Sequence, residues 1–200
     1  PDIRYYLYPV RGIRRKNLGE TLLWSAVADR ADVCLALTLA PLNPLEIPRY
    51  ESWKQLAREC HLPFLFEVGS KGGLTFGENL AAADALITTS IAEGFGMVFL
   101  ECWLADRYLV GRDLPEITAD FVATGVNLSQ LEPQLLVPVD WIGREEFERD
   151  LKSAYHRMLA AYHRSRPTSA EISREAEKLV RDGILDFARL SPRLQSNVIA

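Results

Sequence analysis

Two carboxylates on either side of a glycine-bearing loop carry the strongest chemical signal in this sequence. Glu93 begins the run Glu-Gly-Phe-Gly, and Glu101 follows eight positions later. The loop connects an apolar run, residues 85–88, to a segment with helical spacing, residues 96–105. A strand that passes through such a loop into a helix aims unpaired backbone N–H groups and the positive end of the helix dipole at one point. The pattern therefore predicts a site for an anion such as a diphosphate, approached closely over Gly94 and Gly96.

The two carboxylates are expected to bind different parts of an extended ligand. Glu101 shares a helix face with the apolar Met97 and Leu104, so a half-buried carboxylate there needs hydrogen-bond donors. The hydroxyls of a ribose are suitable donors, and the alternative is a salt bridge to a neighbouring element. Glu93 precedes the helix and can face an open cleft. Because Glu101 lies roughly 7 Å along the axis from the helix start, the two need not form the close pair of a retaining glycosidase.

A basic segment near the amino terminus could neutralise the same anion. Arg11, Arg14, Arg15 and Lys16 follow a β-rich run, residues 3–10, and precede a predicted helix. Arginine offers a bidentate fork to phosphate and lysine a point charge. Positive charge is unfavourable at the amino end of a helix, which favours a binding role over the alternative of a solvated helix start.

The elements that must position these residues alternate between strands and helices. Asn17 and Glu20 have the spacing of a capping box at the start of a helix that runs to about residue 30. This rhythm predicts an α/β fold, a doubly wound parallel sheet with ligands at the carboxyl ends of its strands. The expected strands are residues 3–10, 33–39, 64–68, 85–88 and 108–111, and the expected helices between them are residues 49–60, 76–82, 96–105 and one that starts at 113–116.

The pattern changes at about residue 143. Residues 143–164 and 169–182 have the spacing of two long helices, and residues 184–200 suggest a closing helix or arm. We therefore expect a Rossmann-like domain over residues 1–142 and a helical tail over residues 143–200 that packs on the same domain.

Composition and charge limit the class of partner. The chain has 200 residues, 48% of them hydrophobic, and a net charge of −4, which argues against nucleic acid and anionic membranes. There is no apolar run of the roughly 20 residues that a membrane span needs and no signal pattern, so we expect a cytoplasmic protein. Cys34, Cys60 and Cys102 lack the spacing of a metal site and are interpreted as small core residues.

The loop and its surroundings resemble the retaining GT-B glycosyltransferases of family four, also called glycosyl transferases group 1. The carboxyl-terminal domain of that family carries a Glu-x7-Glu motif, and Glu93 to Glu101 match it in spacing and in the Gly-Phe-Gly between them. The resemblance continues through residues 110–117 and includes Arg11 and Lys16, with Arg14 or Arg15 as further candidates. It covers roughly residues 3–120.

The resemblance implies the donor-binding half of a retaining hexosyltransferase whose donor is a UDP- or GDP-sugar, without a metal or other cofactor. It implies that Arg11 and Lys16, with Arg15, neutralise the leaving diphosphate. It also implies that Glu93 holds the transferred sugar and Glu101 the ribose. The implied catalytic residues are thus Glu93, Arg11 and Lys16, and the implied contacts to sugar and diphosphate include Gly94, Phe95, Gly96, Met97 and Val98.

A complete enzyme of this kind also has an amino-terminal domain that supplies the acceptor site. We expect that domain to be missing from this chain, so that the isolated chain is inactive or nearly so. Two alternatives remain: a nucleotide-sugar-binding module without transfer activity, and a doubly wound scaffold in which the two glutamates are structural.

Overall fold

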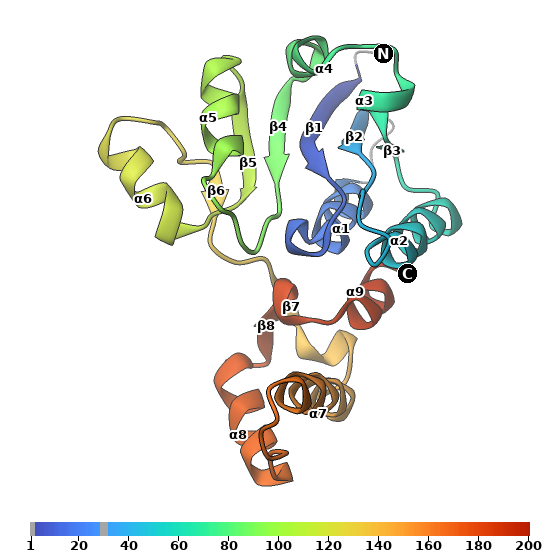
Figure 1. Ribbon diagram of the computed structural model, residues 1–200, viewed down its shortest axis with the longest axis vertical. Coiled ribbons are helices and arrows are strands. Elements are labelled where there is room, and N and C mark those ends of the chain that lie inside the picture. The colour runs from blue at the N-terminus through green and yellow to red at the C-terminus, as the bar shows by residue number, and fades with distance from the viewer. Residues whose placement is uncertain (1–2, 29–31) are drawn as a thin grey trace. The chain divides into compact units, whose positions relative to one another are not determined.

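Six parallel strands form one sheet in the order β3-β2-β1-β4-β5-β6 in the computed structural model, which describes residues 3–28 and 32–200 (Figure 1). This is the strand order of a dinucleotide-binding fold. It confirms the predicted doubly wound parallel sheet. The strands are β1 (Arg4–Arg11), β2 (Val33–Leu39), β3 (Phe64–Phe66), β4 (Ala85–Thr88), β5 (Tyr108–Arg112) and β6 (Leu131–Glu132).

The direction of winding reverses between β1 and β4. The chain leaves β1 toward β2 on one side, and it leaves β4 toward β5 on the other, although β1 and β4 are neighbours with Leu7 beside Leu86. In folds of this kind, such a reversal is where a ligand-binding crevice forms at the carboxyl edge of the sheet. The loop of Lys16 follows β1 and the loop of Glu93 follows β4, so both lie at this position.

Helices connect the strands, and every residue of β4 is buried, as expected of a strand covered on both faces. On one face, Leu7 and Leu86 belong to an apolar cluster with Val98, Phe99 and Cys102. The helical elements of this unit are η1 (Arg14–Lys16), α1 (Leu18–Ala28), α2 (Ile47–Glu59), α3 (Val68–Lys71), α4 (Phe76–Ala82), α5 (Met97–Leu104) and α6 (Pro115–Ala123). The end of the first predicted helix, at residues 29–31, lies outside the described residues.

The expected capping box of Asn17 and Glu20 was wrong. The two backbone N–H groups that it would satisfy donate to backbone carbonyls instead, Asn17 to Arg14 at 3.1 Å and Glu20 to Asn17 at 2.9 Å. The two side chains do meet, since Asn17 Nδ2 donates to Glu20 Oε2 at 2.8 Å, but Asn17 has the left-handed conformation (φ 49°) that ends η1, where an N-cap residue is extended. Glu20 also accepts from the Arg112 guanidinium at 2.6 Å, with side chains only 2% and 5% exposed. A residue interpreted as a helix cap is thus half of a buried ion pair between α1 and β5.

A second polar cluster lies at the carboxyl end of β3. Glu67 accepts from Lys71 at 2.6 Å, from Lys54 at 3.0 Å and from the Tyr50 hydroxyl at 3.2 Å. The hydrogen bond from Lys71, together with that from Lys54, lowers the pKa of Glu67 to about 2.

This lowered pKa predicts an acid-sensitive part of the stability. A carboxylate whose pKa is lower in the folded state stabilises it fully above the unfolded-state pKa, near 4.5, and loses that contribution as the pH falls toward 2. We expect the difference in unfolding free energy between the parent and Glu67→Gln to shrink across this window, measured by urea unfolding at several pH values. Glu59→Gln is the control, because Glu59 is an exposed carboxylate on α2. The prediction would be contradicted if the difference in unfolding free energy between the parent and Glu67→Gln did not change with pH.

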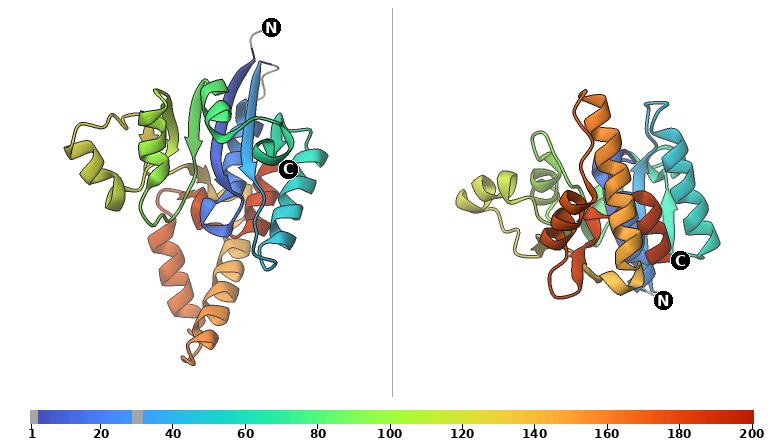
Figure 2. Two further views of the ribbon diagram at one scale, coloured as in Figure 1. Left: turned by 45° about the horizontal axis from the view of Figure 1, so that its top comes forward. Right: turned by 90° about the horizontal axis from the view of Figure 1, so that it is seen from below.

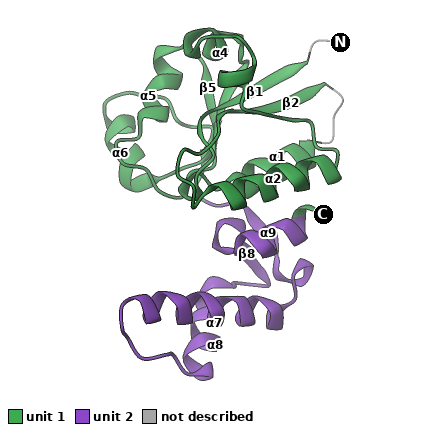
Figure 3. Cartoon of the chain, turned by 45° about the vertical axis from the view of Figure 1, so that its right-hand side comes forward, with its two compact units in different colours: residues 1–133, 199–200 green, residues 134–198 purple. Residues whose placement is uncertain are grey.

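The chain divides into two compact units, residues 1–133 with 199–200 and residues 134–198 (Figure 3). The expected boundary lay between residues 142 and 143, and the packing of the later part on the first domain stays a prediction. Within the second unit, α7 (Arg144–Ala161) and α8 (Ser169–Leu179) lie side by side (Figure 2). They bury Phe147, Ile172 and Ala176.

The second unit also contains strands that the helical pattern did not predict. β7 (Leu136–Pro138) pairs antiparallel with β8 (Ile184–Asp186), and the unit continues through η3 (Phe187–Arg189) to α9 (Pro192–Ile199), with η2 (Val139–Trp141) after β7. Residues 184–200 are therefore a strand and a helix, where one helix or arm was expected. Over residues 3–28 and 32–200, no helix has the length and apolar character needed to cross a bilayer.

Candidate functional site

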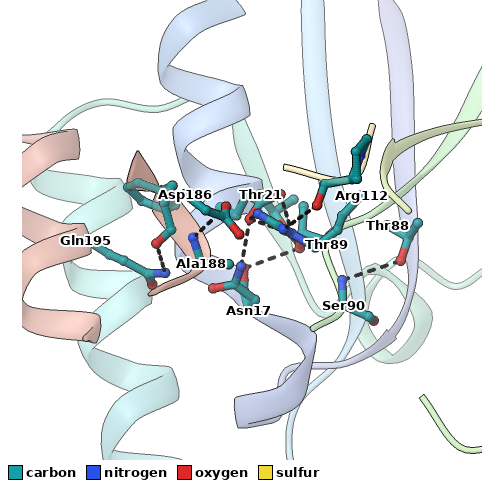
Figure 4. A network of polar contacts seen from close by, with 12 residues as sticks. Asn17, Thr21, Thr88, Thr89, Ser90, Arg112, Asp186, Ala188 and Gln195 are labelled. Atoms are coloured by element: carbon teal, nitrogen blue, oxygen red, sulfur yellow. Dashed lines mark hydrogen bonds and ion pairs between the residues drawn. The ribbon is translucent and has the colours of Figure 1, made fainter. Parts of the chain in front are cut away.

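The loops after β1 and β4 are tied together by hydroxyl groups (Figure 4). Thr89 Oγ1 donates to the Lys16 carbonyl at 2.9 Å and lies 2.8 Å from Thr21 Oγ1. In addition, the Ile91 N–H donates to the Arg15 carbonyl at 2.9 Å. Because Thr89 has one proton to give and gives it to a carbonyl, Thr21 is the donor of the bond between the two threonines. These contacts fix the basic loop against the loop that carries Glu93.

An ion pair between Lys16 and Glu93 joins the two sides of the crevice. The Lys16 ammonium donates to Glu93 Oε1, and the two side chains are only 10% and 7% exposed. Ser90 Oγ donates to the same oxygen at 2.6 Å. A buried charge pair needs such additional donors, because the attraction alone does not offset the loss of water. The structure thus brings together two of the residues that the sequence singled out from segments 77 positions apart.

The other basic residues lie differently. Arg11 is half-buried at the end of β1, and its Nη1 donates to the Ala40 carbonyl after β2 at 3.2 Å. Arg14 and Arg15 are exposed. Lys16 is therefore the cation that contacts Glu93 in the described part of the chain. Roles for Arg11 and Arg15 in binding stay predictions.

The glycine loop presents its backbone to solvent. A side chain at Gly94 would meet open space, and Phe95 is 89% exposed. At Gly96, in contrast, both the backbone conformation and the lack of space require glycine. Its φ is +66°, and a Cβ there would lie 2.6 Å from Ile117 Cγ2, so only glycine fits without a shift of α6.

Helix α5 begins directly after this loop. The Phe99 N–H donates to the Gly96 carbonyl at 3.0 Å, and the N–H groups before it have no helix carbonyl to pair with. Met97 is largely exposed, whereas the Val98 side chain is buried in the core, so only its backbone could meet a ligand. Within the described residues, no side chain caps α5. Ends of this kind favour anions, because their backbone N–H groups and the helix dipole both attract negative charge.

Glu101 lies farther along α5, away from the ion pair. It is half-buried and lines a cavity of about 340 Å³ between α4 and α5, with apolar walls that include Phe76, Leu80 and Leu104. Burial raises the pKa of Glu101, and Glu93 raises it further, while the charge of Lys16 lowers it. The cavity falls within the range of small-molecule sites, and Glu101 provides an acceptor at its wall.

Tyr8 and Ser90 are site residues that the sequence did not indicate. Tyr8 OH lies 2.6 Å from Ser90 Oγ and 3.2 Å from the Lys16 carbonyl. Tyr8 resembles any other aromatic residue of a β-rich run, and its partner is 82 positions away. The hydroxyl run Thr88-Thr89-Ser90 at the end of an apolar strand was the available signal. No group of three potential metal ligands occurs in residues 3–28 and 32–200.

Comparisons with known proteins gave a match to a curated protein and matches to solved structures. No family model matches the chain. The chain is 28% identical over 121 residues to the mannosylglucosyl-3-phosphoglycerate synthase of Petrotoga mobilis, a match that covers 60% of this chain and 23% of that protein. Among solved structures, it is similar to the C-terminal domain of a glycosyl transferase group 1 family protein (LpcC) from Francisella tularensis, with a TM-score of 0.46 and 16% identity over 54% of this chain and 56% of that one. The chain thus spans less than a quarter of the length of the curated relative.

Proposed function

We propose that this chain is the donor-binding domain of a retaining group 1 glycosyltransferase and holds a nucleoside diphosphate sugar in the crevice between β1 and β4. The observation that carries the proposal is the contact of Lys16 and Glu93 across that crevice, beside the amino end of α5. It provides a cation, a helix terminus and a carboxylate at the strand ends where ligands bind in this fold. The sequence similarity to the Petrotoga synthase supports it.

The diphosphate is the part of the ligand that these groups suit best. Its oxygens would accept from the Lys16 ammonium and from the first N–H groups of α5, which need no side chain to bind an anion. As the sugar leaves, negative charge grows on the diphosphate, and the same fixed donors stabilise it. Arg11, at the end of β1, would add a second cation on this side.

The two carboxylates would bind hydroxyl groups at opposite ends of the donor. Glu93 lies beside the diphosphate position and would accept from the transferred hexose. Glu101 would accept from the ribose, since its half-buried position gives a hydroxyl–carboxylate bond little competition from water. Transfer itself needs an acceptor site, which we assign to a separate amino-terminal domain, so this chain alone binds the donor with little or no turnover.

Glu101→Ala tests the ribose contact. We expect nucleoside diphosphate affinity to fall by about 1–3 kcal/mol, roughly tenfold to a hundredfold, through lost hydrogen bonds. Calorimetry of the chain with UDP, GDP, UDP-glucose and GDP-mannose measures this. Only the ionised Glu101 carboxylate accepts both ribose bonds, and the pKa of Glu101 is raised. As the pH falls, the parent should therefore lose nucleotide affinity at a higher pH than a protein whose carboxylate has an ordinary pKa.

Glu59→Ala is the matched control, because it removes an exposed carboxylate on α2. Equal affinity of parent and Glu101→Ala would return Glu101 to a structural role. Absence of heat and of a thermal shift with all four nucleotides would overturn the proposed function.

A further inference from the structure

We infer that Tyr8 and Ser90 are positioning residues that hold the Glu93 carboxylate with one oxygen toward the protein and the other toward the donor sugar. The inference rests on the proposed function, because it assigns the sugar to Glu93. It adds a buried hydrogen-bond chain that runs from β1, through the loop after β4, to the carboxylate. Both positioning side chains are completely buried, so neither can touch the sugar itself.

The direction of each hydrogen bond follows from counting protons. An ionised carboxylate only accepts, so Ser90 Oγ must donate its single proton to Glu93 Oε1 at 2.6 Å. Ser90 Oγ then has only lone pairs left for the hydroxyl 2.6 Å away, which makes Tyr8 the donor of that bond. Burial raises the pKa of Tyr8 to about 12, so the phenol keeps the proton that this arrangement needs.

The chain of bonds leaves one carboxylate oxygen for the ligand. Ser90 and the Lys16 ammonium both donate to Glu93 Oε1. Within the described residues no hydrogen bond or ion pair involves Oε2. A carboxylate held by one oxygen presents the other in a fixed direction, which is what recognition of a sugar hydroxyl requires.

Lys16 meets this chain at the carboxylate. Its ammonium donates to the same Glu93 oxygen as Ser90 does. The Tyr8 hydroxyl also lies 3.2 Å from the Lys16 carbonyl, but its one proton goes to the nearer Ser90 Oγ, so Tyr8 acts on the carboxylate and not on the lysine backbone. When the diphosphate draws Lys16 away, Ser90 remains as the donor that keeps Glu93 in place.

The test is the preference for a sugar nucleotide over its bare nucleotide, the ratio of the two dissociation constants. Calorimetry with UDP and UDP-glucose, and with GDP and GDP-mannose, gives this ratio for the parent, Tyr8→Phe and Ser90→Ala. We expect each variant to lose roughly three- to tenfold of the preference, with the affinity for the bare nucleotide nearly unchanged. Tyr8→Phe removes the hydroxyl and keeps the ring. Ser90→Ala tests the same hydrogen-bond chain at a second position, so the test stands even if one of the two variants folds poorly.

Two further variants separate positioning from a general structural effect. In a Glu93→Ala background, Tyr8→Phe should cause no additional loss, because it acts through that carboxylate. Tyr50→Phe is the matched control, since it removes another buried phenol that bonds a glutamate, Glu67, and it should leave the preference unchanged.

The outcomes distinguish this inference from the proposed function. A parent that prefers the sugar nucleotide, with Tyr8→Phe and Ser90→Ala equally selective, overturns the positioning role and leaves donor binding intact. An additional loss from Tyr8→Phe in the Glu93→Ala background also overturns it. A parent that binds neither bare nucleotide nor sugar nucleotide overturns the proposed function and the positioning role together.

Discussion

Glu20→Ala is expected to lower the free energy of unfolding by about 3–5 kcal/mol, the cost of removing one member of a buried ion pair. Arg112 would keep a guanidinium that is only 5% exposed, with its Nη1 donating to the Pro133 carbonyl at 3.0 Å. The bonds that it would lose join it to Glu20 at 3.2, 3.1 and 2.6 Å. Urea unfolding of parent and variant measures the change.

Two controls show whether the cost comes from breaking this buried pair. Replacing both partners, Glu20→Met with Arg112→Met, should cost less than the sum of the two single substitutions, because each single change already counts the attraction between the two charges. Glu175→Ala, which breaks an exposed ion pair with Lys178 on α8, should cost less than about 1 kcal/mol. A Glu20→Ala protein as stable as the Glu175→Ala protein would contradict the burial argument.

Lys16→Ala is expected to weaken nucleoside diphosphate binding by roughly a hundredfold, about 2–3 kcal/mol, because the proposed charge-assisted bond to the diphosphate is lost. Lys16→Arg should retain part of the affinity, since it keeps the charge but not the compact ammonium. Calorimetry with UDP and GDP at low and high salt is the measurement, and the parent should lose affinity with salt more steeply than Lys16→Ala.

Lys152→Ala is the control for net charge, because it removes a lysine of α7 whose ammonium donates to the Ser169 hydroxyl at 3.3 Å and lies far from residues 93–101 in the sequence. Because Lys16→Ala also leaves the Glu93 carboxylate with Ser90 as its donor, thermal unfolding of the ligand-free variants must accompany the binding data. If a well-folded Lys16→Ala protein binds UDP and GDP as tightly as the parent, the proposed contact between Lys16 and the diphosphate is wrong.

The elements with a long or strict hydrophobic pattern could be predicted from the sequence. The strands at residues 33–39 and 85–88 and the helix at residues 76–82 have the predicted bounds, and the apolar runs of the two strands are local patterns. The pairing of β7 with β8 was missed, since strands of three residues are too short to show alternation. The features that the sequence did not predict are those that depend on residues far apart in the chain.

The site shows the same limit. Glu93, Glu101 and the basic loop are local patterns and were found, although their roles in binding remain predictions. Glu20 was interpreted through its neighbour Asn17, whereas its partner Arg112 is 92 positions away. Tyr8 and Ser90 were missed for the same reason, because a hydrogen bond between two distant hydroxyls has no signature in either local sequence.

The sheet ends on one side in the three residues of β3 and on the other in the two residues of β6. Each outer strand exposes only a few backbone donors and acceptors, so the sheet offers little template for a strand from a second molecule. Edge-to-edge aggregation is thereby disfavoured without a proline or an inward-pointing charge in either outer strand. The short outer strands thus protect the two edges of the sheet and leave the carboxyl ends of the central strands β1 and β4 unaffected.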